Sequence, residues 1–122
     1  MILGLGVDLV PFARIAVARS AAFDHRVFTL AELKYARRHA DANERLAGRF
    51  AAKEAVLKAL GTGWVKGISW RDVETVNDRA GRPVLRLKGK AAKLARSLGI
   101  ARWNLSIAHA GGFAVATAIA ED

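Results

Sequence analysis

The sequence predicts an α+β domain in which a mainly antiparallel sheet packs against one long, alanine-rich helix. Residues 2–10 alternate between apolar and small or polar side chains, as a half-buried strand does. Residues from 43 or 44 to 60 follow a helical period. Two pairs of short apolar segments nearer the C-terminus are separated by turn residues, as in hairpins. The 122 residues are the length of one domain, so we expect residues 1–122 to form a single unit.

The expected N-terminal strand has two different faces. One face carries the large apolar side chains Leu3, Leu5, Val7 and Leu9. Gly4, Gly6 and Asp8 lie on the other face. Because two glycines on one face leave space for close packing, we expect the alanine-rich helix to lie against them.

Two short helices are expected after this strand. Pro11 suits the first turn of a helix that runs to about Ser20. Thr29 and Glu32 have the spacing of a capping box, which predicts a second helix to about His39.

The segment from 43 or 44 to 60 is the longest helical pattern, and Gly61 is well placed to end it. Its large apolar side chains lie on one stripe: Leu46, Phe50, Leu57 and Leu60. Alanines make much of the remaining surface small: Ala47, Ala51, Ala52, Ala55 and Ala59. We therefore expect this helix to lie deep in the fold.

The remaining chain is expected to form two hairpins around a short basic helix. The predicted strands span residues 68–76, 83–88, 103–109 and 113–119. The turn-rich segment 77–82 joins the first pair, and Gly111-Gly112 joins the second. The helix between the hairpins covers residues 90–98.

Charge and composition limit the classes of partner that the protein can be expected to bind. Lysine and arginine total 20 against 11 acidic residues, a net charge of +9, which favours anionic partners. No acidic residue occurs from Arg79 to Ala120, so a nucleic-acid-binding module is one alternative, although no recognised binding motif is present. The absence of cysteine excludes disulfides and thiolate chemistry and favours a cytoplasmic location. The longest apolar stretches are shorter than a membrane span needs, so we expect no membrane association.

Asp8 and Glu54 are candidate ligands of a divalent cation. Glu54 lies at the margin of the apolar stripe, where it would be partly exposed. If the strand and the helix pack together, the two carboxylates converge, and hard carboxylates beside a phosphate substrate favour Mg²⁺. In the alternative, Asp8 caps the next helix and Glu54 pairs with Lys58. The spacing alone favours that alternative.

Three further features have open alternatives. Gly61-Thr62-Gly63 offers backbone amides and a hydroxyl that could hold a phosphate, or it is simply a helix cap and turn. Lys53 falls within the apolar stripe, so either its stem extends to the rim of the core, the commoner case, or its ammonium meets a buried anion. His109, at a strand end, either binds phosphate or moves a proton, or is a solvated side chain.

Four segments of the chain resemble the holo-[acyl-carrier-protein] synthase family of 4′-phosphopantetheinyl transferases. They are Ile2–Val10 with Arg14-Ile15, the segment Arg-Phe-Ala-Ala-Lys-Glu-Ala-Val-Leu-Lys-Ala-Leu-Gly-Thr-Gly at 49–63, Gly81-Arg-Pro83, and Leu105-Ser-Ile-Ala-His109. These segments match in order and distance, and the segment at 49–63 is the most specific.

The resemblance implies an enzyme that transfers the 4′-phosphopantetheine group of coenzyme A to a serine hydroxyl of apo acyl carrier protein. It implies Mg²⁺ as cofactor, release of adenosine 3′,5′-bisphosphate and a role in fatty acid biosynthesis. Asp8 and Glu54 would be the metal ligands, and Glu54 and Lys58 the catalytic residues. Glu54 is the candidate base, directly or through a metal-bound water.

The same resemblance implies a set of binding residues. Those for coenzyme A would be Arg49, Lys58, Gly61, Thr62, Gly63, Pro83 and His109. The family also implies a homotrimer with active sites between subunits. Carrier proteins of this type are acidic, so we expect three basic residues of this chain to bind the carrier protein. They are Arg14, Arg19 and Arg26.

The sequence departs from the family pattern at two positions. Ala108 stands where the family commonly has Ser or Thr, and Ala110 stands where a polar residue is frequent. A trimeric scaffold without activity is a further alternative, but the intact Asp8, Glu54 and Lys58 argue against it.

Overall fold

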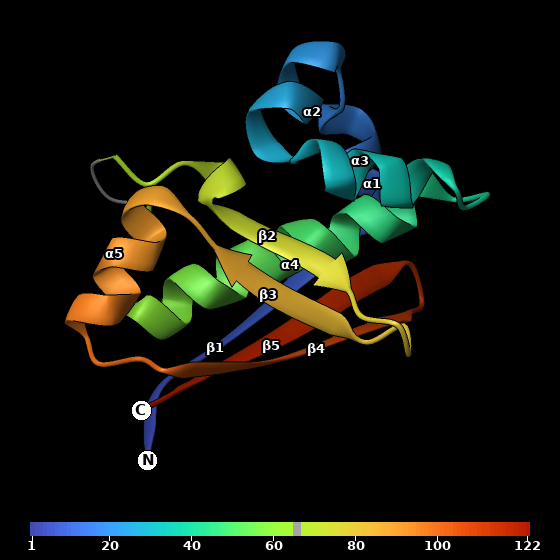
Figure 1. The fold of residues 1–122 in the computed structure, drawn as a ribbon. Coiled ribbons are helices and arrows are strands. Elements are labelled where there is room, and N and C mark those ends of the chain that lie inside the picture. The colour runs from blue at the N-terminus through green and yellow to red at the C-terminus, as the bar shows by residue number, and fades with distance from the viewer. Residues whose placement is uncertain (65–66) are drawn as a thin grey trace.

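The computed structural model describes residues 1–64 and 67–122. Helix α4 (Ala42–Leu60) lies between two antiparallel sheets (Figure 1). The larger sheet has the order β1-β5-β4, and the smaller pairs β2 with β3. The strands are β1 (Ile2–Pro11), β2 (Val73–Asn77), β3 (Pro83–Leu87), β4 (Arg102–Ala110) and β5 (Phe113–Glu121). The predicted α+β class is confirmed, with the strands divided between two sheets.

Three short helices gather around one end of α4 (Figure 1). They are α1 (Phe12–Ala18), α2 (Ala21–Val27) and α3 (Leu30–Arg37). The predicted capping box of α3 is confirmed, with Thr29 and Glu32 satisfying each other's backbone N–H groups. The sequence did not predict α2, whose N-cap is Ser20. Pro11, predicted inside the first helix, ends β1 and precedes α1.

The long helix is the centre of the core, as predicted. The Asp41 side chain accepts a hydrogen bond from the Glu44 N–H at 3.1 Å and caps the start of α4. Gly61 ends the helix in the left-handed conformation, with φ of 78°. The four predicted stripe residues are buried: Leu46, Phe50, Leu57 and Leu60.

The two glycines of β1 bring this strand into direct contact with the α4 backbone. A Cβ atom added to Gly6 would lie 1.8 Å from the Ala55 carbonyl oxygen, and one added to Gly4 would lie 2.1 Å from that of Ala59. Only glycine fits at such distances. The close packing predicted for these positions is confirmed.

The opposite face of β1 is left exposed by the residues that the structure describes. Leu5 is 63% exposed and Leu9 is 58% exposed. A row of exposed large apolar side chains on a sheet face is typical of a surface that another chain covers.

The C-terminal half follows the predicted order. β2 begins at Val73 rather than at residue 68, because residues 70–72 form a short 3₁₀ helix capped by Ser69. Helix α5 (Gly89–Ser97) separates the two hairpins. In the described residues, no helix is both long enough and apolar enough to cross a lipid bilayer.

Candidate functional site

Strand β1 and the last turns of α4 bring Asp8 and Lys58 together. The Lys58 ammonium donates to Asp8 Oδ1 at 3.1 Å and to the Val7 carbonyl oxygen at 2.9 Å. Asp8 does not cap α1, whose N-cap residue Pro11 makes no side-chain hydrogen bond. Among the described residues, Lys58 is paired with Asp8 and not with Glu54. The alternative of a helix cap and an i, i+4 pair is therefore wrong.

Glu54 lies one turn before Lys58 on the same helix and is partly exposed, as expected. Its Oε1 accepts a hydrogen bond from Trp64 Nε1 at 3.4 Å. The Trp64 ring in turn lies against Trp70, with ring centroids 3.8 Å apart. Trp64 thus supports Glu54, a role that sequence reasoning missed because it treated the tryptophans as core or interface anchors.

The donor chemistry of this region fits a hard divalent cation. Within residues 1–64 and 67–122, no three His, Cys, Asp or Glu side chains are grouped closely enough to form a complete metal site. Asp8 and Glu54 are the carboxylates that could hold such a cation, with water and phosphate oxygens completing the shell, which is how Mg²⁺ is held beside phosphate substrates. The Lys58 ammonium on Asp8 indicates that this position already attracts positive charge.

The loop after α4 lies at the same end of the helix as Lys58. Gly61 and Gly63 both have positive φ values, and no atom of the described residues lies within 4 Å of a Cβ built on either. The Thr62 hydroxyl donates to the Gly63 carbonyl at 3.1 Å. The loop is thus a helix cap and turn with open space beside it.

A second group of predicted residues lies elsewhere. Arg49, Pro83 and His109 line one cavity of about 140 Å³. Its other lining residues are Tyr35, Arg45, Asn77, Gly81 and Ile107. Sequence reasoning did not single out these five residues as part of a site, since only the fold brings α3, α4, β4 and the β2–β3 turn together.

Arg49 is held by its neighbours in this cavity. It is 3% exposed, its guanidinium carbon lies 3.9 Å from the centre of the Tyr35 ring, and Nη2 donates to Asn77 Oδ1. Burial lowers the pKa of Arg49, and the nearby Tyr35 and Glu32 oppose this change. The side chain is fixed in place rather than free to move with solvent.

Two nitrogen atoms at this cavity lack partners. Arg49 Nε and His109 Nε2 are both buried, and no hydrogen-bond partner for either exists in the described part of the chain. Burial also lowers the pKa of His109. Buried polar atoms are normally hydrogen-bonded, so this pair favours a ligand rich in acceptor oxygens, such as a phosphate.

The two groups of residues occupy opposite sides of α4. Lys58 follows Arg49 by nine residues, which places them roughly 13–14 Å apart along the helix axis and about half a turn apart around it. One chain therefore presents two separate half-sites.

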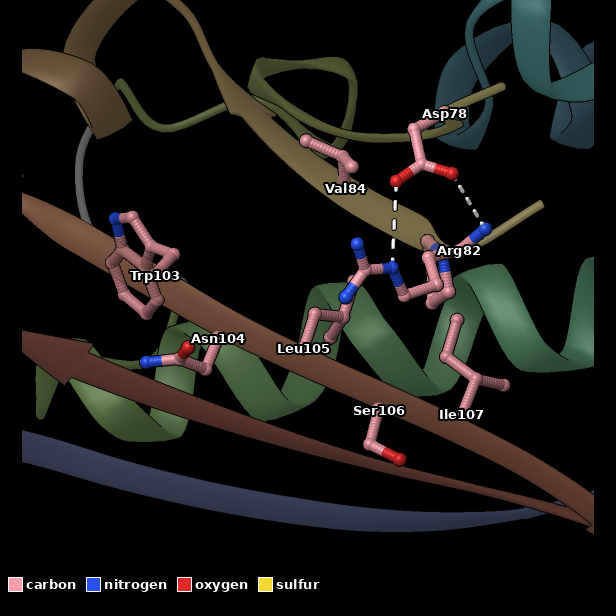
Figure 2. Close-up of a pocket in the computed structure, with 9 residues that line it drawn as sticks. Asp78, Arg82, Val84, Trp103, Asn104, Leu105, Ser106 and Ile107 are labelled. Atoms are coloured by element: carbon pink, nitrogen blue, oxygen red, sulfur yellow. Dashed lines mark hydrogen bonds and ion pairs between the residues drawn. The ribbon is translucent and has the colours of Figure 1, made fainter. Parts of the chain in front are cut away.

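A larger cavity of about 440 Å³ lies between β3 and β4. Figure 2 shows Trp103, Leu105 and Ile107 along β4, with the Asp78–Arg82 pair near the β2–β3 turn. Pro83 and Ile107 line both this cavity and the smaller one. The two cavities are therefore neighbours.

The three predicted docking arginines differ in their surroundings. Arg14 and Arg26 are exposed. Arg19 is partly buried and donates to Asp24 at 2.8 Å and to Asn43 at 3.1 Å, so its charge is already paired. The pairing raises the pKa of Arg19.

Lys53 meets a buried anion, so the alternative of a stem that extends to the rim is wrong. Its ammonium donates to Glu32 Oε1 at 2.8 Å and to the Trp70 carbonyl at 3.1 Å. It also donates to the Val73 carbonyl.

The fold agrees with comparisons against known proteins. The family model that describes the 4′-phosphopantetheinyl transferase superfamily matches residues 4–118 of this chain. The holo-[acyl-carrier-protein] synthase of Koribacter versatilis is 46% identical, with both chains covered completely. That of Geobacter sulfurreducens is 44% identical over 99% of this chain and 98% of its own.

Solved structures give the same result. A crystal structure of the holo-[acyl-carrier-protein] synthase from Neisseria meningitidis has a TM-score of 0.90 at 34% identity, with both chains fully covered. The enzyme from Bacillus anthracis, in complex with CoA (3′,5′-ADP), has a TM-score of 0.81 at 36% identity over 98% of this chain and 96% of its own.

The chain belongs to the 4′-phosphopantetheinyl transferase superfamily. Within it, the chain is an enzyme of the holo-[acyl-carrier-protein] synthase type.

Proposed function

We propose that the enzyme transfers 4′-phosphopantetheine from coenzyme A to a serine hydroxyl of apo acyl carrier protein in a Mg²⁺-dependent reaction that releases adenosine 3′,5′-bisphosphate. The observation that carries this proposal is the pairing of Lys58 with Asp8 where β1 meets α4, with Glu54 one helical turn before Lys58. A carboxylate paired with an ammonium group, and a second carboxylate on the neighbouring helical turn, suit a pyrophosphate with its counter-ion.

Each of these side chains has a distinct role in the proposed reaction. Asp8 and Glu54 would hold Mg²⁺, which when bound neutralises charge on the pyrophosphate and orients it for in-line attack. Lys58 would contact a phosphate oxygen and add a second positive charge. The serine proton would pass to Glu54, either directly or through a water. Gly61, Thr62 and Gly63 would line the phosphate site through their backbone.

The second half-site would hold a phosphate and the nucleotide. The unpartnered Arg49 Nε and His109 Nε2 support phosphate binding in the smaller cavity, and Pro83 would contact the nucleotide. The B. anthracis enzyme was solved with CoA (3′,5′-ADP), a ligand that carries such phosphates.

We propose that the half-sites are completed between the subunits of a homotrimer. The roughly half-turn separation of Arg49 and Lys58 around α4 supports a site shared by neighbouring chains. The exposed apolar face of β1, which includes Leu5 and Leu9, supports an interface. Light scattering of the purified protein tests this. A monomeric mass in a sample that is active would overturn it.

Arg14 and Arg26 would attract the acidic carrier protein, and Arg19 would contribute mainly by positioning α1 and α2. We further propose a cytoplasmic enzyme that serves fatty acid biosynthesis. The absence of cysteine supports the location.

Mass spectrometry of the carrier protein tests the proposed reaction directly. The enzyme is mixed with coenzyme A, Mg²⁺ and an apo acyl carrier protein, and we expect the carrier to gain the mass of one phosphopantetheine group. A carrier of unchanged mass, together with tight nucleic-acid binding near physiological salt, would favour a basic nucleic-acid-binding module instead.

A further inference from the structure

Gly48 is an unusual residue for its position in α4. It is buried in the interior of the helix, where glycine destabilises the helical state relative to alanine. The neighbouring small positions Ala47, Ala51 and Ala52 all carry alanine and are fully buried. Gly48 is not among the glycines with positive φ, so backbone conformation does not require it. Its missing side chain must therefore matter for another reason.

The space beside Gly48 is filled by the imidazole ring of His109. A Cβ atom built on Gly48 would lie 2.8 Å from His109 Nε2, 3.4 Å from His109 Cε1 and 3.0 Å from Ile107 Cγ2. The Phe12 ring is a further neighbour of the imidazole, with ring centroids 6.0 Å apart. His109 thus lies directly against the helix at the one place where α4 has no side chain.

This contact differs from those of the β1 glycines. At Gly4 and Gly6, an added Cβ would meet the backbone of α4, which cannot move aside. At Gly48, it would meet mainly the end of a side chain, which can rotate. An alanine at position 48 would therefore displace the imidazole rather than prevent folding.

We propose that Gly48 is a positioning residue that sets the depth of the His109 ring, which lines the small cavity shared with Arg49. The inference rests on the proposed function, because it assigns the ring to phosphate binding. It adds that the position of the ring depends on a glycine in another element, 61 positions earlier in the sequence. A side chain at position 48 would fill that space and displace the imidazole, although the histidine itself would still be present.

The test compares Gly48→Ala, His109→Ala and the double variant by calorimetric titration with coenzyme A. We expect each single variant to bind coenzyme A about 10- to 150-fold more weakly, the loss of one hydrogen bond to a charged group. The double variant should be no weaker than His109→Ala, because the glycine acts only through the ring. Losses that multiply in the double variant would overturn the proposal.

The pKa of His109, followed by NMR titration of the free protein, gives a readout independent of coenzyme A. A ring displaced toward solvent should have a pKa closer to the ordinary value, because burial lowers it in the native chain. An unchanged pKa in Gly48→Ala would contradict the proposed positioning. If the native protein binds no coenzyme A, the proposed function fails while this measurement still decides the role of Gly48.

Thermal unfolding covers the case in which Gly48→Ala disturbs the fold. If the added methyl group collides with the imidazole, the double variant Gly48→Ala/His109→Ala should recover the lost stability. A double variant that stays as unstable as Gly48→Ala would overturn the proposal, because the collision would then lie elsewhere.

Discussion

Lys53 and Glu32 form an ion pair 2.8 Å long in which neither side chain is exposed to solvent. Glu32 also accepts hydrogen bonds from the Thr29 N–H at 2.9 Å and the Thr75 N–H at 3.0 Å. One carboxylate thus joins α3, β2 and α4. Burial lowers the pKa of Lys53, and the charge of Glu32 opposes that change.

We predict that Lys53→Met lowers the free energy of unfolding by about 3–5 kcal/mol, because it leaves Glu32 buried without its cation. Urea denaturation measures the change. Lys58→Met is the matched control, since Lys58 is 53% exposed, and its effect should be below about 1 kcal/mol. Equal effects of the two variants would show that the buried pair has no special role.

Asp8→Ala and Glu54→Ala should each reduce phosphopantetheine transfer by more than about 100-fold, because each removes a proposed ligand of Mg²⁺. Both side chains are at least partly accessible, so circular dichroism spectra should be unchanged. Mass spectrometry of the carrier protein measures the activity. Full activity in either folded variant would remove that residue from the proposed metal site.

The stability of the protein should fall as the pH drops below about 6.5, the ordinary pKa of histidine. Burial lowers the pKa of His109 in the folded state, so below that pH the unfolded chain binds more protons and is favoured. Urea denaturation at about pH 7.5 and about pH 5.5 measures the loss.

His109→Gln provides the control for this pH dependence, because glutamine does not titrate. The variant should lose less stability than the native chain between the two pH values. Glu74, whose pKa is lowered by Thr29 and Lys88 against the opposing effect of burial, contributes equally to both proteins and cancels in the comparison. If the variant and the native chain lose the same stability between the two pH values, His109 is not the source of the pH dependence.

Arg14→Glu and Arg26→Glu should raise the KM for the carrier protein several-fold with little change in kcat. Both arginines are exposed, so they would act on the rate at which the carrier protein associates with the enzyme. The effect should shrink as salt is added. Lys93→Glu, on the exposed face of α5, is the matched charge reversal and should leave KM unchanged. Equal changes from all three variants would indicate a response to net charge and not a docking site.

Arg19→Glu should differ from these variants because it also places a like charge beside Asp24. We expect a lower melting temperature in addition to a higher KM. A variant with native stability would show that the Arg19–Asp24 pair contributes little to the packing of α1 against α2.

Features that depend on local spacing could be predicted from the sequence. The Thr29–Glu32 capping box and the Gly61 helix end are set by residues close in the chain, and both were confirmed. The contact of Gly4 and Gly6 with α4 could also be predicted, because two glycines on one strand face have few other uses. Helix α2 was missed because seven residues carry little periodic pattern, and short helices depend on tertiary packing.

Features that depend on distant residues could not be predicted. Arg49 meets Asn77 across 28 positions of sequence, and Lys53 meets Glu32 across 21. Lys53 illustrates the difficulty: extension of the stem to the rim is the commoner outcome for a lysine at the edge of a core, and only the fold places a carboxylate opposite it. Ala108 and Ala110, by contrast, follow the local alternation of a strand: both are exposed and lie on the face of β4 opposite His109.

The contact of the β1 glycines with the α4 carbonyls determines which part of the molecule opens last. Amide protons of α4, and those of β1 that pair with β5, should exchange with deuterium only through global unfolding, whereas those of α1, α2 and α3, each no longer than eight residues, should exchange through local opening. Asp8 and Lys58 both lie on the slowly exchanging unit. The Asp8–Lys58 pair is consequently in place in the resting protein, and the fluctuating region is the one that carries Arg14 and Arg26.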